Sequence, residues 1–254
     1  MPFYVSPEQA MRDKADYARK NIARGRDAVV LQFDGGILFV APNSFRNLHK
    51  ISEIYDKIAF AGVGLYNEFE NLRKAGVRYA DFNGYLYDRS DVTGLGLANA
   101  YGQTLSTIFT ESNKPYEVEI VVAEVGTTSE RDQIYRVTFD GSVTEERRYV
   151  AMGGQAEQVA TALKEKYTDD LTLAAAIGVA LDSLAGHGQG NGDRASMTAD
   201  KLEVAMLGRT GAHRRFRRLT GARLEALLEE AKPPAAEPAA TDSDSTEDSS
   251  GPAS

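Results

Sequence analysis

Histidine is the residue type best suited to metal binding and to base catalysis near neutral pH, and this chain has three histidines. His49, His187 and His213 lie far apart and show no spacing typical of zinc ligands. A serine triad would need one of them as its base, yet no Gly-x-Ser-x-Gly elbow accompanies them. The chain has no cysteine, which excludes disulfides, thiolate metal sites and cysteine nucleophiles. We therefore expect no metal, no cofactor and three surface histidines.

A glycine-rich stretch, "GLGLANAYG" at 94–102, has the residue types of a nucleotide-binding loop. The dinucleotide fingerprint must follow a strand, however, and this stretch follows no strand pattern. Leu97 also shares a helical face with Tyr101, Leu105 and Ile108. The pattern therefore favours a packed helix over a cofactor site.

A cluster of basic residues near the end of the body could bind nucleic acid. Its members lie within ten residues and flank Phe216: Arg209, His213, Arg214, Arg215, Arg217 and Arg218. The alternative is an alternating strand whose arginines are solvated or lie at an interface. The body is not basic overall and no recognised RNA or DNA motif surrounds the run, so we favour the strand and expect no nucleic-acid partner.

The element ahead of the first strands is a charged helix, predicted over residues 7–24. Ser6 is suited to the N-cap, Pro7 to the first helical position, and Gln9 to the reciprocal partner of a capping box. The apolar stripe is thin, so we expect this helix to pack on something outside its own core. The stripe consists of Met11, Ala15, Ala18 and Ile22.

The remaining elements form contiguous blocks. We expect a hairpin at 29–33 and 37–41 with Asp34-Gly35 as its turn, and strands at 51–54 and 58–62. Helices at 65–75 and 95–109 follow, and then strands at 117–125, 134–139 and 143–150. Two more helices at 155–167 and 171–184, a flexible loop at 186–198, two late strands and a last helix capped by Thr220 complete the body.

Blocks of strands that alternate with pairs of helices argue against a parallel βαβ fold and fit antiparallel sheets covered by helices. A four-layer α-β-β-α sandwich satisfies this order, so the expected fold class is α+β, with the N-terminal helix as an addition. The 254 residues suffice for one good core. No apolar run approaches the roughly 20 residues of a membrane helix, and the N-terminus lacks the pattern of a secretory signal. We expect a cytoplasmic protein without a membrane partner.

The C-terminal segment, residues 232–254, differs in composition from the body. It holds five acids and one base, a charge of −4 that is half of the total of −8. Four of the eight prolines lie in it, and it has no aromatic residue. Such a segment cannot bury enough apolar surface to offset its ordering entropy, so we expect a disordered acidic tail.

Several motifs together resemble the α subunits of proteasomes, and the actinobacterial type most closely. The resemblance extends from about residue 5 to residue 231. The matching residues are Ser6-Pro7-Glu8-Gln9, Tyr17-Ala18-Arg19, "DGGILFVA" (34–41), "HKISEIYDKIAFAGVGLYNEFENLRKAG" (49–76), "YDRSDVTG" (87–94), "TIFTESNKPYEVEIVVAEV" (107–125), "YRVTFDGS" (135–142) and "MGG" (152–154). The resemblance implies the four-layer fold of the N-terminal-nucleophile (Ntn) hydrolases and a seven-membered α ring that caps a ring of catalytic β subunits.

The resemblance also explains the junction Gly25-Arg26-Asp27, which lies between the first helix and the first strand. In the β subunits the mature chain begins there with a threonine that supplies both the nucleophile and a free α-amine. Here Arg26 and Asp27 offer no nucleophile, and a helix continues upstream. We therefore expect no catalytic residue in this chain.

Three regions are implied to carry function. Residues 1–7 form a gate segment, with Phe3, Tyr4, Val5 and Pro7 as the residues that we expect to occlude an axial pore. The loop 110–117 rims a constriction, or annulus, through Thr110, Glu111 and Ser112. A pocket between neighbouring α subunits receives the C-terminal carboxylate of an activator through Lys50, Gly64 and Leu65.

The sequence thus predicts a gate segment at 1–7, an α-type domain at 8–231 and a tail at 232–254. The expected function is that of a non-catalytic α-ring subunit of the 20S core, which gates substrate entry and docks ring ATPase activators. The expected partners are β subunits, neighbouring α subunits and a ring ATPase. The alternative is a free-standing Ntn-type hydrolase or an assembly scaffold.

Overall fold

A computed structural model describes residues 6–45, 47–185, 194–211 and 214–232. The helices are α1 (Pro7–Ile22), α2 (Tyr66–Leu86), α3 (Gly94–Glu111), α4 (Ala156–Lys166), α5 (Leu173–Ala185) and α6 (Gly221–Glu230), and the 3-10 turns are η1 (Arg89–Asp91), η2 (Ser129–Arg131), η3 (Arg194–Ser196) and η4 (Ala199–Lys201). The strands are β1 (Ala28–Phe33), β2 (Gly36–Pro42), β3 (Ile51–Tyr55), β4 (Ile58–Gly64), β5 (Val118–Glu124), β6 (Gln133–Val137), β7 (Val143–Glu146), β8 (Tyr149–Met152), β9 (Leu202–Gly208) and β10 (Phe216–Leu219).

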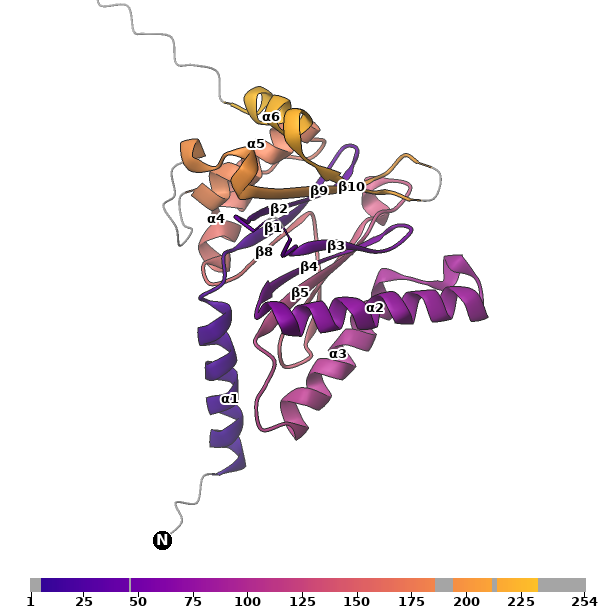
Figure 1. Ribbon diagram of the computed structural model, residues 1–254, viewed down its shortest axis with the longest axis vertical. Coiled ribbons are helices and arrows are strands. Elements are labelled where there is room, and N and C mark those ends of the chain that lie inside the picture. Colours follow the sequence, from indigo (N-terminus) through magenta and orange to yellow (C-terminus); the bar gives the residue numbers. More distant parts are fainter. Residues whose placement is uncertain (1–5, 46, 186–193, 212–213, 233–254) are drawn as a thin grey trace, which may run out of the picture.

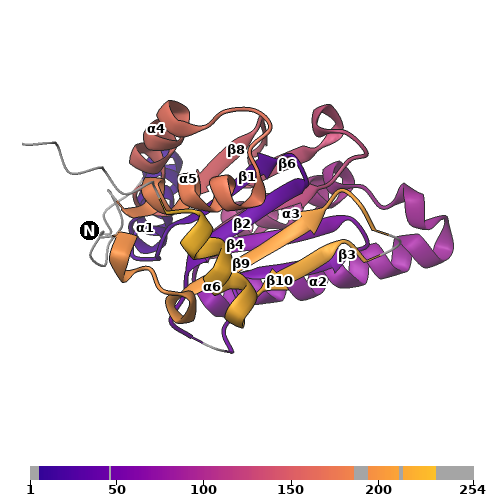
Figure 2. The same cartoon turned by 90° about the horizontal axis from the view of Figure 1, so that it is seen from above.

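Two antiparallel five-stranded sheets lie face to face between two layers of helices (Figures 1 and 2). One sheet has the order β10-β9-β2-β1-β8 and the other β3-β4-β5-β6-β7. Helices α4, α5 and α6 cover the first sheet, and α2 and α3 cover the second. Three apolar cores separate the four layers, one of them between the two sheets. The predicted four-layer sandwich is confirmed.

Strand β1 shows why the sequence of the central strands is apolar at almost every position. Val30 points into the core between the sheets, whereas Val29 and Leu31 point into the core beneath the helices. Both faces of the strand are therefore buried, and the usual alternation of apolar and polar residues is lost. The predicted hairpin is confirmed, because β1 pairs with β2 from Val29 opposite Val40 to Phe33 opposite Gly36.

The predicted strand at 143–150 is wrong as a single element. Strand β7 pairs with β6 in one sheet, and β8 pairs with β1 in the other. The chain crosses between the sheets at Arg147 and Arg148, and Arg148 has a positive φ of 72°. That backbone conformation is uncommon for a non-glycine residue, and it breaks the single strand that was predicted over 143–150.

The predicted helix at 65–75 is too short. Helix α2 continues through Gly76 to Leu86 because this glycine faces α3 rather than ending the helix. A Cβ atom at Gly76 would overlap the hydroxyl group of Tyr101 on α3. The glycine therefore permits close packing of the two helices, and the loss of helix propensity is offset by that contact.

Helix α1 begins as predicted and ends two residues earlier, at Ile22 rather than residue 24. Ser6 caps it by accepting a hydrogen bond from the Gln9 backbone N–H at 3.2 Å. The Gln9 side chain does not complete the capping box, because it donates instead to Asp13 Oδ1 at 2.7 Å. Ala18 and Ile22 are buried against the inter-sheet core, whereas Met11 is 37% exposed. The apolar contacts of the helix with the body therefore lie in its C-terminal half.

Some predictions concern residues outside the described part of the chain. These are the gate residues Phe3, Tyr4 and Val5, the tail from residue 233 onward, and residues 186–193 of the predicted flexible loop. The later part of that loop is ordered as η3, where Arg194 binds Asp182 and the carbonyl of Ala231. Among the described residues, none of the helices has the length and apolarity required to cross a membrane.

Candidate functional site

The segment that joins α1 to β1 brings the predicted pocket residues together. Lys50 Nζ donates a hydrogen bond to the carbonyl oxygen of Arg26 at 2.8 Å. A Cβ atom at Gly25 would lie 3.4 Å from the backbone nitrogen of Gly64. Lys50 directly precedes β3 and Gly64 ends β4, and the backbone N–H of Gly62 in β4 donates to the carbonyl oxygen of Lys50 at 3.0 Å. The two residues therefore lie beside the same short segment, although fourteen positions separate them in the sequence.

Lys50 has an unusual electrostatic environment. Desolvation is the largest cause that lowers the pKa of its ammonium to about 8, and the nearby Arg26 guanidinium lowers it further. The carboxylates of Glu203 and Asp27 act in the opposite direction. The ammonium is therefore charged at pH 7, although burial destabilises its charged form. An additional anionic partner stabilises that charged form.

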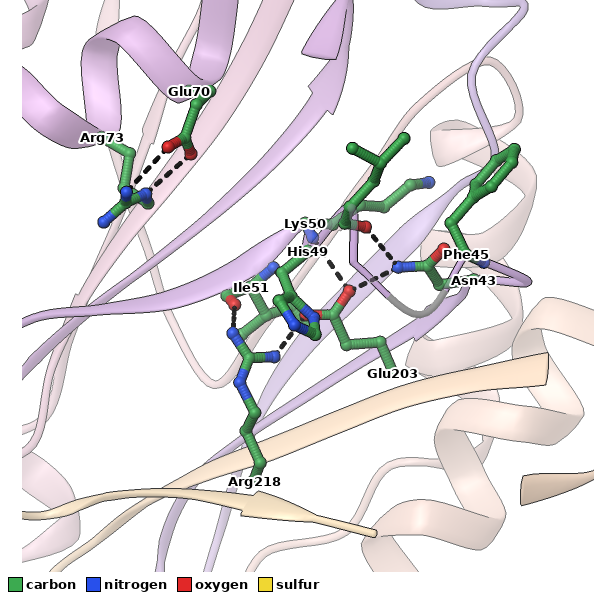
Figure 3. A network of polar contacts seen from close by, with 10 residues as sticks. Asn43, Phe45, His49, Lys50, Ile51, Glu70, Arg73, Glu203 and Arg218 are labelled. Atoms are coloured by element: carbon green, nitrogen blue, oxygen red, sulfur yellow. Dashed lines mark hydrogen bonds and ion pairs between the residues drawn. The ribbon is translucent and has the colours of Figure 1, made fainter. Parts of the chain in front are cut away.

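Glu203 on β9 is the centre of the polar network that holds the backbone of this region (Figure 3). Its Oε2 accepts from the backbone N–H of Lys50 at 2.9 Å, and its Oε1 accepts from Arg218 Nη1 at 2.6 Å. The remaining partners of its carboxylate are Ile51 N, Asn43 Nδ2 and His49 Nδ1. Because Glu203 is 7% exposed, these bonds replace the hydration that it lost and fix the start of β3.

No role was predicted for Glu203, because residues 201–207 ("KLEVAML") were expected only to form one of the two late strands. An acid inside an apolar run was the available signal, because a buried carboxylate requires partners. His49, expected at the surface, is partly exposed and lies 3.3 Å from this carboxylate.

Gly64 and Leu65 form the turn from β4 into α2. Gly64 has φ of +110°, and a Cβ atom there would overlap the carbonyl oxygen of Glu117. The backbone N–H of Leu65 donates to that same oxygen at 2.9 Å. The Leu65 side chain remains 44% exposed. This turn therefore presents an apolar side chain to the outside while the glycine allows β5 to approach closely.

Two of the three predicted annulus residues do not lie in a loop. Thr110 and Glu111 are the last residues of α3, and Ser112 is its C-cap. The prediction of a loop from residue 110 is therefore wrong. The Thr110 hydroxyl donates to the carbonyl of Ser106 at 2.9 Å, a bond that a helical threonine readily makes. The irregular segment is limited to residues 112–117.

The segment 112–117 is fixed to the start of α2 by ion pairs. Lys114 Nζ lies 2.6 Å from Glu68 Oε1 and 2.7 Å from Glu117 Oε1. Glu68 Oε2 also accepts from the backbone N–H of Glu117 at 2.6 Å. The segment 112–117 and the start of α2, which follows the Gly64–Leu65 turn, are therefore joined by ion pairs and a hydrogen bond.

Two buried acids lie on the other side of the junction. The Asp27 Oδ1 atom accepts from the backbone N–H of Gln155 at 3.0 Å, and Glu119 Oε2 accepts from Gly153 N at 3.2 Å. Burial raises the pKa of both carboxyl groups, and Arg136 offsets part of the effect at Glu119. The burial of the two acids was not predicted from the sequence, because their partners are far away along the chain.

The arginine cluster is largely committed to partners within the chain. Arg209 binds Asp132 at 2.8 Å, and Arg214 binds Glu53 at 2.6 Å. Arg218 binds Glu203. The Arg209 and Arg214 pairs reach the opposite sheet, whereas Arg218 and Glu203 lie on neighbouring strands of one sheet. These pairs favour the strand interpretation over a nucleic-acid surface.

Pro7, the described member of the gate set, occupies the first position of α1 and is exposed.

Comparisons with known proteins agree with this geometry. A family described as proteasome subunit matches residues 23–207. The proteasome subunit alpha of Thermobifida fusca is 65% identical over 231 residues, which cover 91% of this chain and 92% of that protein. The proteasome subunit alpha of Thermomonospora curvata is 64% identical over 230 residues, covering 91% and 98%. The one from Parafrankia sp. is 60% identical over 239 residues, covering 92% and 99%.

Proposed function

Because the chain belongs to the proteasome subunit family, we propose that it is a non-catalytic α-ring subunit of a cytoplasmic 20S core. In this role it assembles with β subunits and with neighbouring copies, gates the entry of substrates, and docks a ring ATPase activator. The observation that carries the proposal is the structure of the α1–β1 junction.

That junction lacks the parts of a threonine hydrolase. The chain enters β1 from α1 through residues 23–27, so no α-amine is free at the start of the strand. Arg26 and Asp27 supply no nucleophile there, and the Asp27 carboxylate is bound to Gln155 N. A hydrolase of this fold needs both the hydroxyl and the amine at that point. The geometry therefore supports a non-catalytic ring subunit over a free-standing hydrolase.

The first prediction concerns this absence of chemistry. We expect the isolated chain to release no product from a fluorogenic peptide, whereas co-expression with its β partner yields active four-ring particles. Activity should disappear when the β threonine is replaced by alanine and persist when Ser44, the hydroxyl bonded to Arg26, is replaced by alanine. Negative-stain micrographs and peptide hydrolysis are the two measurements. Turnover by the isolated chain would restore the hydrolase alternative, and failure to form rings with a β partner would contradict the core-particle assignment.

An exposed aromatic surface at the C-terminal end of α2 suits assembly on the β ring. Tyr79, Phe82 and Leu86 recur on one face of the helix, and Phe82 is 63% exposed. Tyr85 and Tyr87 add further exposed rings, with 88% of Tyr85 accessible. Aromatic residues gathered on a surface are typical of buried interface cores, and a subunit of a larger particle has such surfaces when it stands alone.

The second prediction tests this surface. We expect the double variant Phe82→Asp, Tyr85→Asp to fold with an unchanged melting temperature, because both rings are largely exposed, and to lose incorporation into particles. The conservative pair Phe82→Tyr, Tyr85→Phe should assemble normally. Gel filtration of the co-expressed subunits measures incorporation. Normal assembly of the aspartate variant would show that this surface does not contact a β subunit.

Activator docking is proposed for the pocket of Lys50, Gly64 and Leu65. The ammonium of Lys50 offers a positive charge, and Leu65, the residue after Gly64, offers an exposed apolar side chain. A carboxylate that leaves water requires such an opposite charge. The network around Glu203 keeps the backbone of Lys50 in place, so the charge is held ready before an activator arrives.

A further inference from the structure

A short loop between β2 and β3 presents two large apolar side chains to the outside. Residues 43–45 and 47–49 of this loop are called the hook here. Phe45 is 68% exposed and Leu48 is 41% exposed. The Phe45 ring points away from the polar network around Glu203 (Figure 3). Apolar side chains gathered on an exposed segment indicate a contact with another molecule.

The conformation of the hook is fixed by a buried asparagine. Asn43 is 6% exposed, and its Oδ1 accepts a hydrogen bond from the backbone N–H of Phe45 at 2.9 Å. Its Nδ2 donates to the carbonyl oxygen of Leu48 at 2.7 Å and to Glu203 Oε2 at 2.8 Å. A loop that is already ordered loses little conformational entropy when it binds. The hook is therefore prepared to insert the Phe45 ring into a partner.

A cavity of about 460 Å³ is present where α1 ends and α4 begins. It is lined by the C-terminal turn of α1, by residues 138–140 after β6, and by residues 153–158 at the start of α4. Ile22 and Phe139 contribute apolar walls, and each of them is 6% exposed. The space exceeds that of one aromatic side chain, and apolar walls favour such an occupant.

The hook and the cavity lie on opposite edges of the sandwich. Strands β3 and β7 are the two edges of one sheet, and β10 and β8 are the edges of the other (Figure 2). The hook leads into β3, whereas the cavity lies between the residues that precede β7 and those that follow β8. Antiparallel pairing from β3 to β6 places the start of β3 and the end of β6 at the same end of the sheet.

This arrangement suits a head-to-tail contact between copies. A second copy that lies beside the first, along the direction that crosses the strands, brings its hook to the cavity of the first. Such a contact joins two different surfaces of the same chain, and it closes into a ring when the rotation between copies allows it. The second copy is therefore an occupant that the position of both surfaces favours.

The charges at the two surfaces are also complementary. The exposed Arg26 guanidinium lies beside the hook, where its Nη1 donates to Ser44 Oγ at 2.9 Å. At the cavity, Glu157 is exposed in the first turn of α4 and forms no ion pair with the described part of the chain. Arg19 and Arg136 of the lining each bind an acid within the chain. The hook with its adjacent cation thus faces a cavity whose remaining charge is acidic.

We propose that the hook of one copy enters the cavity of the next copy, with the Phe45 ring against Ile22 and Phe139. The proposal rests on the proposed assembly with neighbouring copies, and it assigns the residues of that contact. Lys50 directly follows the hook, and both are held by the Glu203 carboxylate. The contact therefore places the proposed activator pocket at the seam between two copies.

Cross-linking in assembled particles tests the contact directly. The chain has no cysteine, so introduced cysteines are the only thiols of the subunit. Phe45→Cys combined with Gln158→Cys should give linked oligomers of the subunit on a denaturing gel after treatment with a short thiol-specific cross-linker. The two positions lie on opposite edges of one chain, so the link joins two copies. The control pair is Phe45→Cys with Lys164→Cys, which is exposed about 9 Å further along α4 and should give single chains.

Loss of the ring tests the same contact through assembly. Phe45→Ser should keep the melting temperature of the isolated subunit, because the ring is exposed, and should lower the yield of particles at least about tenfold. Phe45→Tyr keeps an aromatic ring and should assemble as wild type does. Gel filtration of the co-expressed subunits measures the yield.

The outcomes separate this contact from the proposed function. If wild-type particles form, yet the Gln158 pair gives single chains and Phe45→Ser assembles normally, the hook contact is wrong and the ring assignment stands. Equal cross-linking of both cysteine pairs would likewise overturn the contact. If the wild-type chain forms no particle with its β partner, the proposed function fails and this proposal fails with it.

Discussion

Replacing Lys50 by alanine is expected to abolish activator docking and activator-dependent protein degradation, while ring assembly and hydrolysis of small peptides remain intact. The variant removes the cation that pairs with the activator carboxylate and leaves that carboxylate without a partner. Removal of one member of a desolvated ion pair costs about 2–5 kcal/mol. Because every subunit of a ring carries the same change, the losses act together on a multivalent complex. A pull-down with the ring ATPase and a degradation assay measure the effect.

The control variant must replace a lysine that does not stabilise the fold. Lys57 is unsuitable, because its Nζ binds the buried Glu124 at 2.7 Å. Lys164 on α4 is exposed and lies in the helix layer on the far side of the other sheet, so Lys164→Ala should bind activator as wild type does. Lys50→Arg should rescue docking only in part, because the wider guanidinium must fit a site formed for an ammonium. Activator binding by Lys50→Ala at wild-type strength would remove Lys50 from the pocket.

The pH dependence of docking follows from the same residue. The pKa of Lys50 is lowered to about 8, so the free pocket loses its positive charge as the pH rises through 8. Docking should therefore weaken above pH 8 and approach a loss of about tenfold per pH unit. The free energy of unfolding changes in the opposite direction. Between pH 8 and 10.5 the unfolded chain keeps the Lys50 proton that the folded chain has released. The cost of burying the charge is therefore lost, and this group makes the folded state more stable as the pH rises through that range.

Deletion of residues 1–5 is expected to raise peptide hydrolysis by the assembled core several-fold without any activator. Entry of substrate, rather than cleavage of the bond, limits the rate when a gate is closed. The number of active β threonines should not change, and titration with a covalent inhibitor checks it. The deletion stops before Ser6 on purpose, because Ser6 accepts the capping bond from Gln9 and its loss would fray α1.

Substrate size provides the sharper readout for the gate. An unfolded protein substrate should gain more from the deletion than a tripeptide does, because a long chain needs a wide pore for a longer time. Full-length and truncated particles are compared at equal concentrations of titrated active sites. Equal rates for both substrates would mean that residues 1–5 do not occlude the pore.

Local sequence patterns by themselves determined the fold class. The cap at Ser6 and Pro7, the Asp34-Gly35 turn and the apolar runs of the central strands act over a few residues, so the sequence specifies them directly. The order of these elements then favoured two facing sheets between helices, and the structure has them. The absence of a nucleophile at Gly25-Arg26-Asp27 is equally a property of the sequence.

Only the tertiary structure shows where a contact with a distant residue determines the local backbone or the partner of a side chain. The backbone of Arg148 divides the predicted strand at 143–150 between two sheets, and Gly76 lies inside α2, where the absence of a Cβ atom leaves room for Tyr101. Glu203 and Lys14 likewise bind groups more than ninety positions away. Buried charges and helix ends need hydrogen-bond partners, and these partners can come from any segment that the fold brings close. A local sequence pattern does not indicate which residue that partner is. The sequence therefore determined the order of the layers and the absence of a nucleophile at the junction. The packing of distant segments determined the arrangement of the residues around Lys50.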